Sequence, residues 1–392
     1  MPAFFRTLSF FSKLYWSLVF VVIVVFLASG VSAYMSVYDT LMREKRIDFL
    51  KLTVQSSNEL SHVFDHGRLI ARLISTQDDV RNFFSDKKGS ADEILKKISH
   101  YNIEGNFSAI YLMDTSGKAI VSTDETFVGR DFSFRNYFKS AIEGKSFVDS
   151  AVGVVSRRMG YYFSFPIYSK DGNTITGVAV AKMEPEEVGK VIIESGLDPV
   201  KDLMLTNDNG VILYSKDENR LFKSLTVLGE ERAKIERDTR FVGREIRPLS
   251  YDEAAEVIYA YKSARIIDIY DELDSEREIQ AIAKVGSYPF FLVTEVERDI
   301  FNSGVVTSIL PVVINTVGGI LLSIALIWFV VSRMARPIEQ IRSYTVRKAA
   351  DEREGKLEIR TGDELEEISL AVNHLVRKVE GKKIEERRER LK

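Results

Sequence analysis

The chain has 392 residues, a formal net charge of −3 and no cysteine. The balanced charge argues against a nucleic-acid-binding protein, which is usually basic overall. The absence of cysteine excludes disulfides, thiolate metal ligands and cysteine nucleophiles, and the length predicts roughly two to three domains.

Two uncharged, apolar segments divide the chain and predict transmembrane helices over residues 14–35 and 304–332. No charged residue occurs between Leu14 and Tyr38, and a bilayer core needs only about 20 apolar residues of helix. A cleaved signal peptide is the alternative for the first segment, but its apolar region would be shorter, about 7–15 residues. We therefore expect two membrane spans.

Basic residues flank both spans on one side of the membrane and predict the orientation. Residues 1–13 contain Arg6 and Lys13, and five basic residues follow the second span, namely Arg333, Arg336, Arg342, Arg347 and Lys348. Because cytoplasmic flanks carry an excess of Lys and Arg, both ends of the chain are expected in the cytoplasm. Residues 36–303 would then lie outside the cytoplasm, in a multi-pass protein of the inner (plasma) membrane of a bacterial or archaeal cell.

The extracytoplasmic segment is expected to form a long helix followed by two related α+β lobes. Residues 31–66 contain no Gly or Pro, which predicts one helix that is either a plain stalk or a dimerising, signal-transmitting element. Strand-and-turn patterns then recur, so we predict a distal lobe over residues 85–195 and a proximal lobe over residues 199–299. Strands are expected at residues 108–113, 119–122, 160–168, 174–183, 202–206, 211–215, 257–262 and 290–296.

One short helix is predicted between the two hairpins of the distal lobe. It covers residues 134–143, with Ser133 as its N-cap and Gly144 after its last turn.

Three sequence blocks in the distal lobe carry a family resemblance. They are GRDFSFRNYF at residues 129–138, GYYFSFPI at residues 160–167 and GVAVAKMEP at residues 177–185. On these blocks, residues 34–301 resemble a double Cache domain, the PAS-like sensor of bacterial receptors, and are similar to the C4-dicarboxylate sensor kinases. The resemblance implies that a small molecule binds in the distal lobe.

Arg135 and Lys182 are the first candidates for binding that molecule, and the resemblance implies that both face a distal pocket. An Arg fork binds a carboxylate through two hydrogen bonds, and a Lys neutralises a second one. Strand alternation places Lys182 on the same face as Val178 and Val180. The alternatives are that Arg135 pairs with Asp131 at the surface and that Lys182 is solvated at a strand end.

Tyr137, Tyr162, Ser164 and Arg157 complete the candidate set. The tyrosines and the serine hydroxyl would orient the ligand, or they could simply pack in the core with satisfied hydroxyl groups. Arg157 lies in a loop where the dicarboxylate family is expected to have small, neutral residues, so the exact ligand stays open. Because Lys182 stands where an amino-acid receptor would need an acid, we expect a carboxylate ligand.

The remaining charged segments suggest no chemistry. Residues 230–247 and the acidic run at 268–278 are interpreted as solvated surface, and a metal site in the acidic run or between His62 and His66 is the minor alternative. The sequence predicts no catalytic residues, no metal site and no cofactor.

The segment 333–385 resembles a HAMP domain, in which two short helices per subunit form a parallel four-helix bundle in a homodimer. Pro337, the DEL tripeptide at Asp363 and Asn373 carry the resemblance, although Glu366 stands where the family usually has Gly. A lone amphipathic coiled coil is the alternative. The apolar seam follows steps of three and four residues, at Leu365, Ile368, Val372, Leu375 and Val379.

Together these features predict a transmembrane signal-transduction receptor and not an enzyme. Its output would be a histidine kinase, cyclase or chemotaxis domain after Lys392, or a separate cytoplasmic partner. A chemotaxis receptor or the sensor part of a diguanylate cyclase for another ligand, such as an amino acid, remains an alternative. A non-signalling envelope scaffold is the third possibility, although a pure anchor needs no HAMP-like converter.

Overall fold

A computed structural model describes residues 10–102, 105–194, 201–271, 276–350 and 355–390. The chain divides into two compact units, one of residues 41–304 and one that combines the two terminal parts.

Residues 41–304 contain two five-stranded antiparallel sheets of the same topology. Their strand orders are β2-β1-β5-β4-β3 and β7-β6-β10-β9-β8. The first sheet, in the distal lobe, consists of β1 (Phe107–Asp114), β2 (Ala119–Ser122), β3 (Phe147–Val152), β4 (Met159–Tyr168) and β5 (Ile175–Met183). The second sheet, in the proximal lobe, consists of β6 (Asp202–Asn207), β7 (Ile212–Tyr214), β8 (Arg265–Asp271), β9 (Glu276–Lys284) and β10 (Phe290–Glu297).

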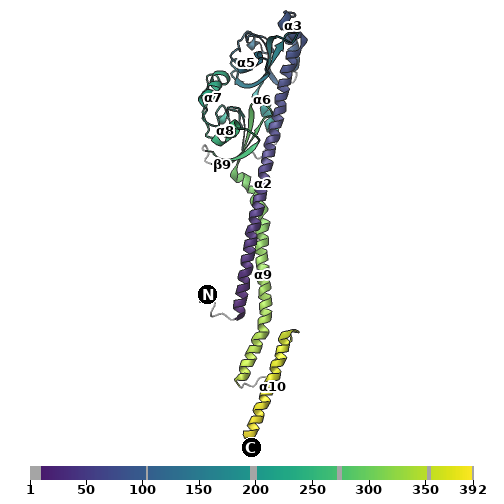
Figure 1. The fold of residues 1–392 in the computed structure, drawn as a ribbon, viewed down its shortest axis with the longest axis vertical. Helices are drawn as coiled ribbons and strands as arrows, with labels where there is room; N and C mark the ends of the chain where they lie inside the picture. Colours follow the sequence, from purple (N-terminus) through teal and green to yellow (C-terminus); the bar gives the residue numbers. More distant parts are fainter. Residues whose placement is uncertain (1–9, 103–104, 195–200, 272–275, 351–354, 391–392) are drawn as a thin grey trace. The chain divides into compact units, whose positions relative to one another are not determined.

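One long helix, α2 (Phe10–Thr76), packs against one face of both sheets. Its Phe64 contacts Phe163 of the first sheet and Phe290 of the second. Gly67 allows a close approach, because a Cβ there would lie 2.4 Å from the Phe163 ring. The opposite faces are covered by α5 (Asn136–Ile142) in the distal lobe and α8 (Asp252–Tyr259) in the proximal lobe (Figure 1).

Short helices join these elements. They are α3 (Asp78–Asp86), α4 (Ala91–Ser99), η1 (His100–Asn102), η2 (Glu125–Phe127), α6 (Pro185–Glu194), η3 (Glu218–Arg220), α7 (Glu230–Ile235) and the π-helical turn η4 (Glu236–Arg240). A capping box begins α4, since the Ser90 hydroxyl accepts from the Glu93 amide and the Glu93 carboxylate accepts from the Ser90 amide. As predicted, Gly144 follows α5, with a φ of 86° that favours glycine.

The α+β fold expected from the sequence is confirmed, with local corrections. Seven of the eight predicted strands lie within two residues of observed ones, but residues 257–262 do not form a strand, because α8 runs to Tyr259. The strands β3, β8 and β9 were not predicted. The N-cap of α5 is Arg135, not Ser133, whose backbone N–H donates to Asp131 instead.

The second unit consists of the first part of α2, the helix α9 (Arg298–Ala349) from Val305 onward, and α10 (Glu364–Arg390). Both α2 and α9 contain segments long and apolar enough to cross a membrane. They approach closely at Gly319, where a Cβ would lie 2.3 Å from the Phe26 ring; small residues permit such contacts in membranes. Before α10, the Leu357 backbone exchanges two hydrogen bonds with the Asn373 side chain.

Candidate functional site

The strand register places the candidate residues of the distal lobe on the sheet face that α5 covers. Tyr162 of β4 lies between Asp149 of β3 and Lys182 of β5. Residues aligned across neighbouring strands point to the same face. Acidic, aromatic and basic side chains therefore form one row on the sheet face covered by α5, the helix whose N-cap is Arg135.

Arg135 is fully buried, and its guanidinium donates to two carbonyl oxygens from different lobes. One Nη donates to Val152 O of β3 at 2.7 Å and the other to Thr239 O of η4 at 2.6 Å. Its Nε has no hydrogen-bond partner in the described part of the chain. The alternative pairing with Asp131 is wrong. The two carbonyl acceptors are neutral groups, so neither supplies a full negative charge to this buried cation.

Lys182 is also buried, with 1% of its side chain exposed, which contradicts the alternative of a solvated strand end. Its Nζ donates to Glu184 Oε1 at 2.5 Å and to Ser156 Oγ at 3.3 Å. Gly160 on β4 makes room for the side chain, because a Cβ there would lie 2.7 Å from Lys182 Cε.

The rings of Tyr137 and Tyr162 stack face to face, with centroids 4.9 Å apart and planes 7° apart. Tyr111 donates its hydroxyl to that of Tyr137 at 2.9 Å. Burial raises the pKa of Tyr137 to about 12, although the nearby Arg135 charge opposes the shift. The phenols are therefore neutral at physiological pH and can donate hydrogen bonds.

Ser164 and Arg157 lie in different surroundings. The buried Ser164 hydroxyl donates to Tyr137 O at 2.8 Å and so anchors α5 to β4. Arg157 is exposed in the turn between β3 and β4, in the left-handed conformation with φ of 56°. The structure thus gathers Arg135, Tyr137, Tyr162, Ser164 and Lys182 in the interior and leaves Arg157 at the surface.

One ion pair that sequence reasoning missed joins this row to the proximal lobe. The buried Asp149 carboxylate accepts from Arg240 Nε at 2.9 Å. Burial raises the pKa of Asp149, and the Arg240 charge opposes that shift. The expectation that residues 230–247 are solvated is therefore wrong for Glu236 and Arg240, which are buried. The Asp149 side chain lies in the row with Tyr162, so the pair belongs to the candidate site.

The proximal lobe has the opposite charge at the equivalent place. Lys182 pairs across strands with Tyr162 and Ala109, and Glu295 of β10 pairs in the same way with Gln280 and Asp202. Arg220 neutralises this cluster, with contacts to Glu295 at 2.8 Å, Asp271 at 2.9 Å and Asp202 at 3.3 Å. The position that holds the basic Lys182 in the distal lobe thus holds the acidic Glu295 in the proximal lobe.

Two carboxylates of the acidic run at 268–278 belong to this cluster, so the expectation of a solvated surface is wrong for them. Asp271 and Glu278 are fully buried, and their oxygens lie within 4.8 Å of those of Glu295. These three carboxylates are the one group among the described residues close enough to share a metal ion. Arg220 already contacts Asp271 and Glu295, and Lys201 contacts Glu278, which makes the cluster a buried network of acidic and basic side chains.

We expect the Glu278→Gln variant to flatten the pH dependence of the free energy of unfolding. Burial and the neighbouring Glu295 raise the pKa of Glu278 to about 8, so the folded state holds a proton that the unfolded state releases above its ordinary pKa of 4.5. Stability is therefore lost as pH rises through this window, by up to about 1.4 kcal/mol per pH unit. Thermal melts of wild type and variant between pH 5 and 8.5 measure the difference.

The control for this experiment is Glu276→Gln on the same strand, whose carboxylate is half exposed. It should leave the slope of stability against pH unchanged. A Glu278→Gln protein with the wild-type slope would contradict the prediction.

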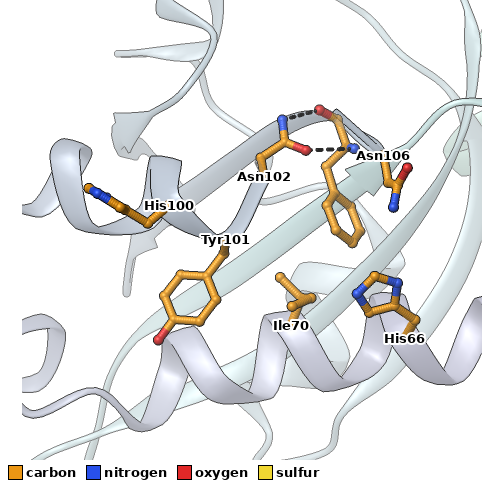
Figure 2. A pocket seen from close by; sticks show the side chains of 7 residues that line it. His66, Ile70, His100, Tyr101, Asn102 and Asn106 are labelled. Carbon is orange, nitrogen blue, oxygen red and sulfur yellow. Dashed lines mark hydrogen bonds between the residues drawn. The ribbon is translucent and has the colours of Figure 1, made fainter. Parts of the chain in front are cut away.

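A separate surface pocket of about 270 Å³ lies where α2 passes η1 and the start of β1. Figure 2 shows the His66 ring directed toward Asn106, whereas His100 points away from it. Asn102 exchanges two hydrogen bonds with the Phe107 backbone and closes one side. Among the described residues, no metal-sized grouping includes His62 or His66.

Comparisons with known proteins agree with this fold. The Cache domain family matches residues 37–305. The C4-dicarboxylate transport sensor protein DctB of Pseudomonas aeruginosa is 28% identical over 173 residues, which are 42% of this chain and 28% of that protein. The protein of the same name from Rhizobium meliloti is 28% identical over 198 residues, 49% of this chain and 31% of that protein.

Among solved structures, the sensor domain of the V. cholerae histidine kinase DctB aligns with a TM-score of 0.51 and 20% identity. The alignment covers 67% of this chain and 98% of that domain, and at this identity the likeness shows the fold alone. The chain spans about a third or less of the length of the curated relatives that it matches. Because the family match covers more than half of the residues, the chain belongs to the Cache domain family, and residues 37–305 form its double Cache sensor domain.

Proposed function

We propose that this protein is a transmembrane receptor whose distal lobe binds a small carboxylate, held by Arg135 and Lys182. The observation that carries the proposal is the buried guanidinium of Arg135, which donates to neutral carbonyls and whose Nε has no hydrogen-bond partner among the described residues. Burying a cation without a counter-charge is costly. A ligand carboxylate would supply that charge and accept two parallel hydrogen bonds from the guanidinium.

The other candidate residues would orient the ligand and favour a ligand that carries a second negative charge. The neutral Tyr137 and Tyr162 phenols offer donors beside the stacked rings, and Ser164 fixes the Tyr137 backbone. Lys182, whose partner Glu184 is 17% exposed, would meet a second carboxylate. Arg157 is exposed and follows Ser156, whose hydroxyl contacts Lys182. Its charge would attract an anionic ligand to the surface of the lobe.

The relatives named as C4-dicarboxylate sensors support a dianionic ligand of about four carbons. The test is calorimetry on the full chain in lipid nanodiscs with succinate, butyrate and succinamide, which carry two, one and no carboxylates on similar skeletons. Succinate should bind at least about tenfold more tightly than butyrate, because one charged hydrogen-bonded contact is lost. If succinate, malate, fumarate and other small carboxylates all fail to bind, the proposal is lost.

We further propose that residues 304–332 and 333–385 transmit the signal across the membrane to a cytoplasmic output, as a HAMP domain in a homodimer would. The connector before α10 supports this, since Asn373 and Ser369 hold the Leu357 backbone and Ile359 is buried. The chain has no cysteine, so single cysteines introduced into α9 report cross-linking between copies cleanly. A cross-linking pattern that never changes with a bound ligand would favour a scaffold over a receptor.

A further inference from the structure

Asp149 is a buried carboxylate within the row that we propose as the binding site. It pairs across strands with Tyr162, which in turn pairs with Lys182. An ionised acid at this place would repel a carboxylate ligand and attract an ammonium group. The counter-ion of Asp149 therefore decides which class of ligand the row can accept.

That counter-ion comes from the other lobe. Arg240 ends the π-helical turn η4, and its Nε donates to Asp149 Oδ1 at 2.9 Å. Such π-turns are often found at functional sites. The same segment contacts Arg135, because the Thr239 carbonyl accepts from the Arg135 guanidinium at 2.6 Å. The turn η4 of the proximal lobe thus contacts both Asp149 and Arg135 of the distal site.

Proximal-lobe residues fix Arg240 in this position. Its Nη1 donates to Glu236 at 2.7 Å and to Asp208 at 2.9 Å. Glu236 is held in turn by the Asn207 and Asn209 side-chain amides. Contacts within the proximal lobe therefore orient the Arg240 guanidinium toward Asp149.

We infer that Arg240 is a specificity-determining residue, which pairs with Asp149 so that the distal site accepts a dicarboxylate and rejects its ammonium-bearing analogue. This inference rests on the proposed function. In an ammonium-binding site, a free carboxylate faces the ligand. Here the Arg240 guanidinium pairs with that carboxylate. Arg135, whose guanidinium donates to neutral carbonyls, is then the cation that would meet an anion first.

The test compares succinate with L-aspartate, which has the same carbon skeleton with one ammonium group added. Calorimetry uses the full chain in nanodiscs, as wild type and as Arg240→Met. Wild type should prefer succinate. The variant leaves Asp149 without its partner, so the ratio of succinate to aspartate affinity should fall at least about tenfold, a lower bound for a close buried charge pair.

Three further variants separate this role from a structural one. Arg240→Lys keeps the charge and should keep most of the wild-type ratio, whereas Asp149→Asn/Arg240→Met removes both charges and should restore the preference for succinate. Arg237→Met, three residues earlier and 63% exposed, is the matched control and should leave the ratio unchanged.

Each outcome decides between the proposals. If Arg240→Met weakens both ligands equally, or if the double variant keeps the ratio of the single one, Arg240 is only a strut between lobes and the inference is overturned. If Arg240→Met does not fold, Asp149→Asn alone decides, because a fall in the ratio of that variant would overturn the inference. A folded wild type that binds neither ligand overturns the proposed function itself.

Discussion

Replacing Arg220 by methionine should lower the free energy of unfolding of the sensor domain by about 3–5 kcal/mol, the usual cost of removing one partner of a buried ion pair. Arg220 contacts the buried carboxylates of Asp202, Asp271 and Glu295. Methionine fills a similar volume but leaves these acids without their common cation. In a domain of this size the loss corresponds to a fall in Tm of roughly 6–20 °C.

Thermal melts followed by circular dichroism measure this effect, with Arg247→Met as the matched control. Arg247 is 73% exposed and pairs with the exposed Glu245, and such surface pairs contribute only about 0–1 kcal/mol. An Arg220→Met protein that melts within about 2 °C of wild type would contradict the role assigned to this network.

Much of the fold could be predicted because its signals are local. The hairpins at Asp114–Lys118 and Asn207–Gly210 combine alternating apolar strands with Gly turns, and both are observed. The strand predicted at 257–262 was wrong because a short apolar run does not distinguish helix from strand. The missed strands β3, β8 and β9 carry buried charges such as Asp149 and Glu278, which interrupt the expected alternation.

In the candidate site, too, the residues with a local sequence signal could be predicted and the long-range pair could not. The resemblance pointed to Arg135 and Lys182 because both lie inside recognisable blocks, and the structure buries both on one side of the sheet. Asp149 and Arg240 are 91 residues apart in the chain, and Arg240 lies in the charged segment 230–247 that was expected to be solvated. No local sequence pattern predicts an ion pair between residues so far apart in the chain. Only the docking of η4 against β3 turns two surface-like residues into one buried pair.

Replacing Arg135 by glutamine should weaken succinate binding by at least about 100-fold, because two charged hydrogen bonds of about 1.5–3 kcal/mol each are lost. Arg135→Lys keeps the charge but loses the planar guanidinium, so succinate affinity should fall about tenfold. Arg130→Gln, an exposed arginine of the same lobe, is the control and should bind as wild type does. Calorimetry on variants with wild-type melting profiles measures the loss. Unchanged affinity in a folded Arg135→Gln protein would mean that the guanidinium serves only to hold the Val152 and Thr239 carbonyls.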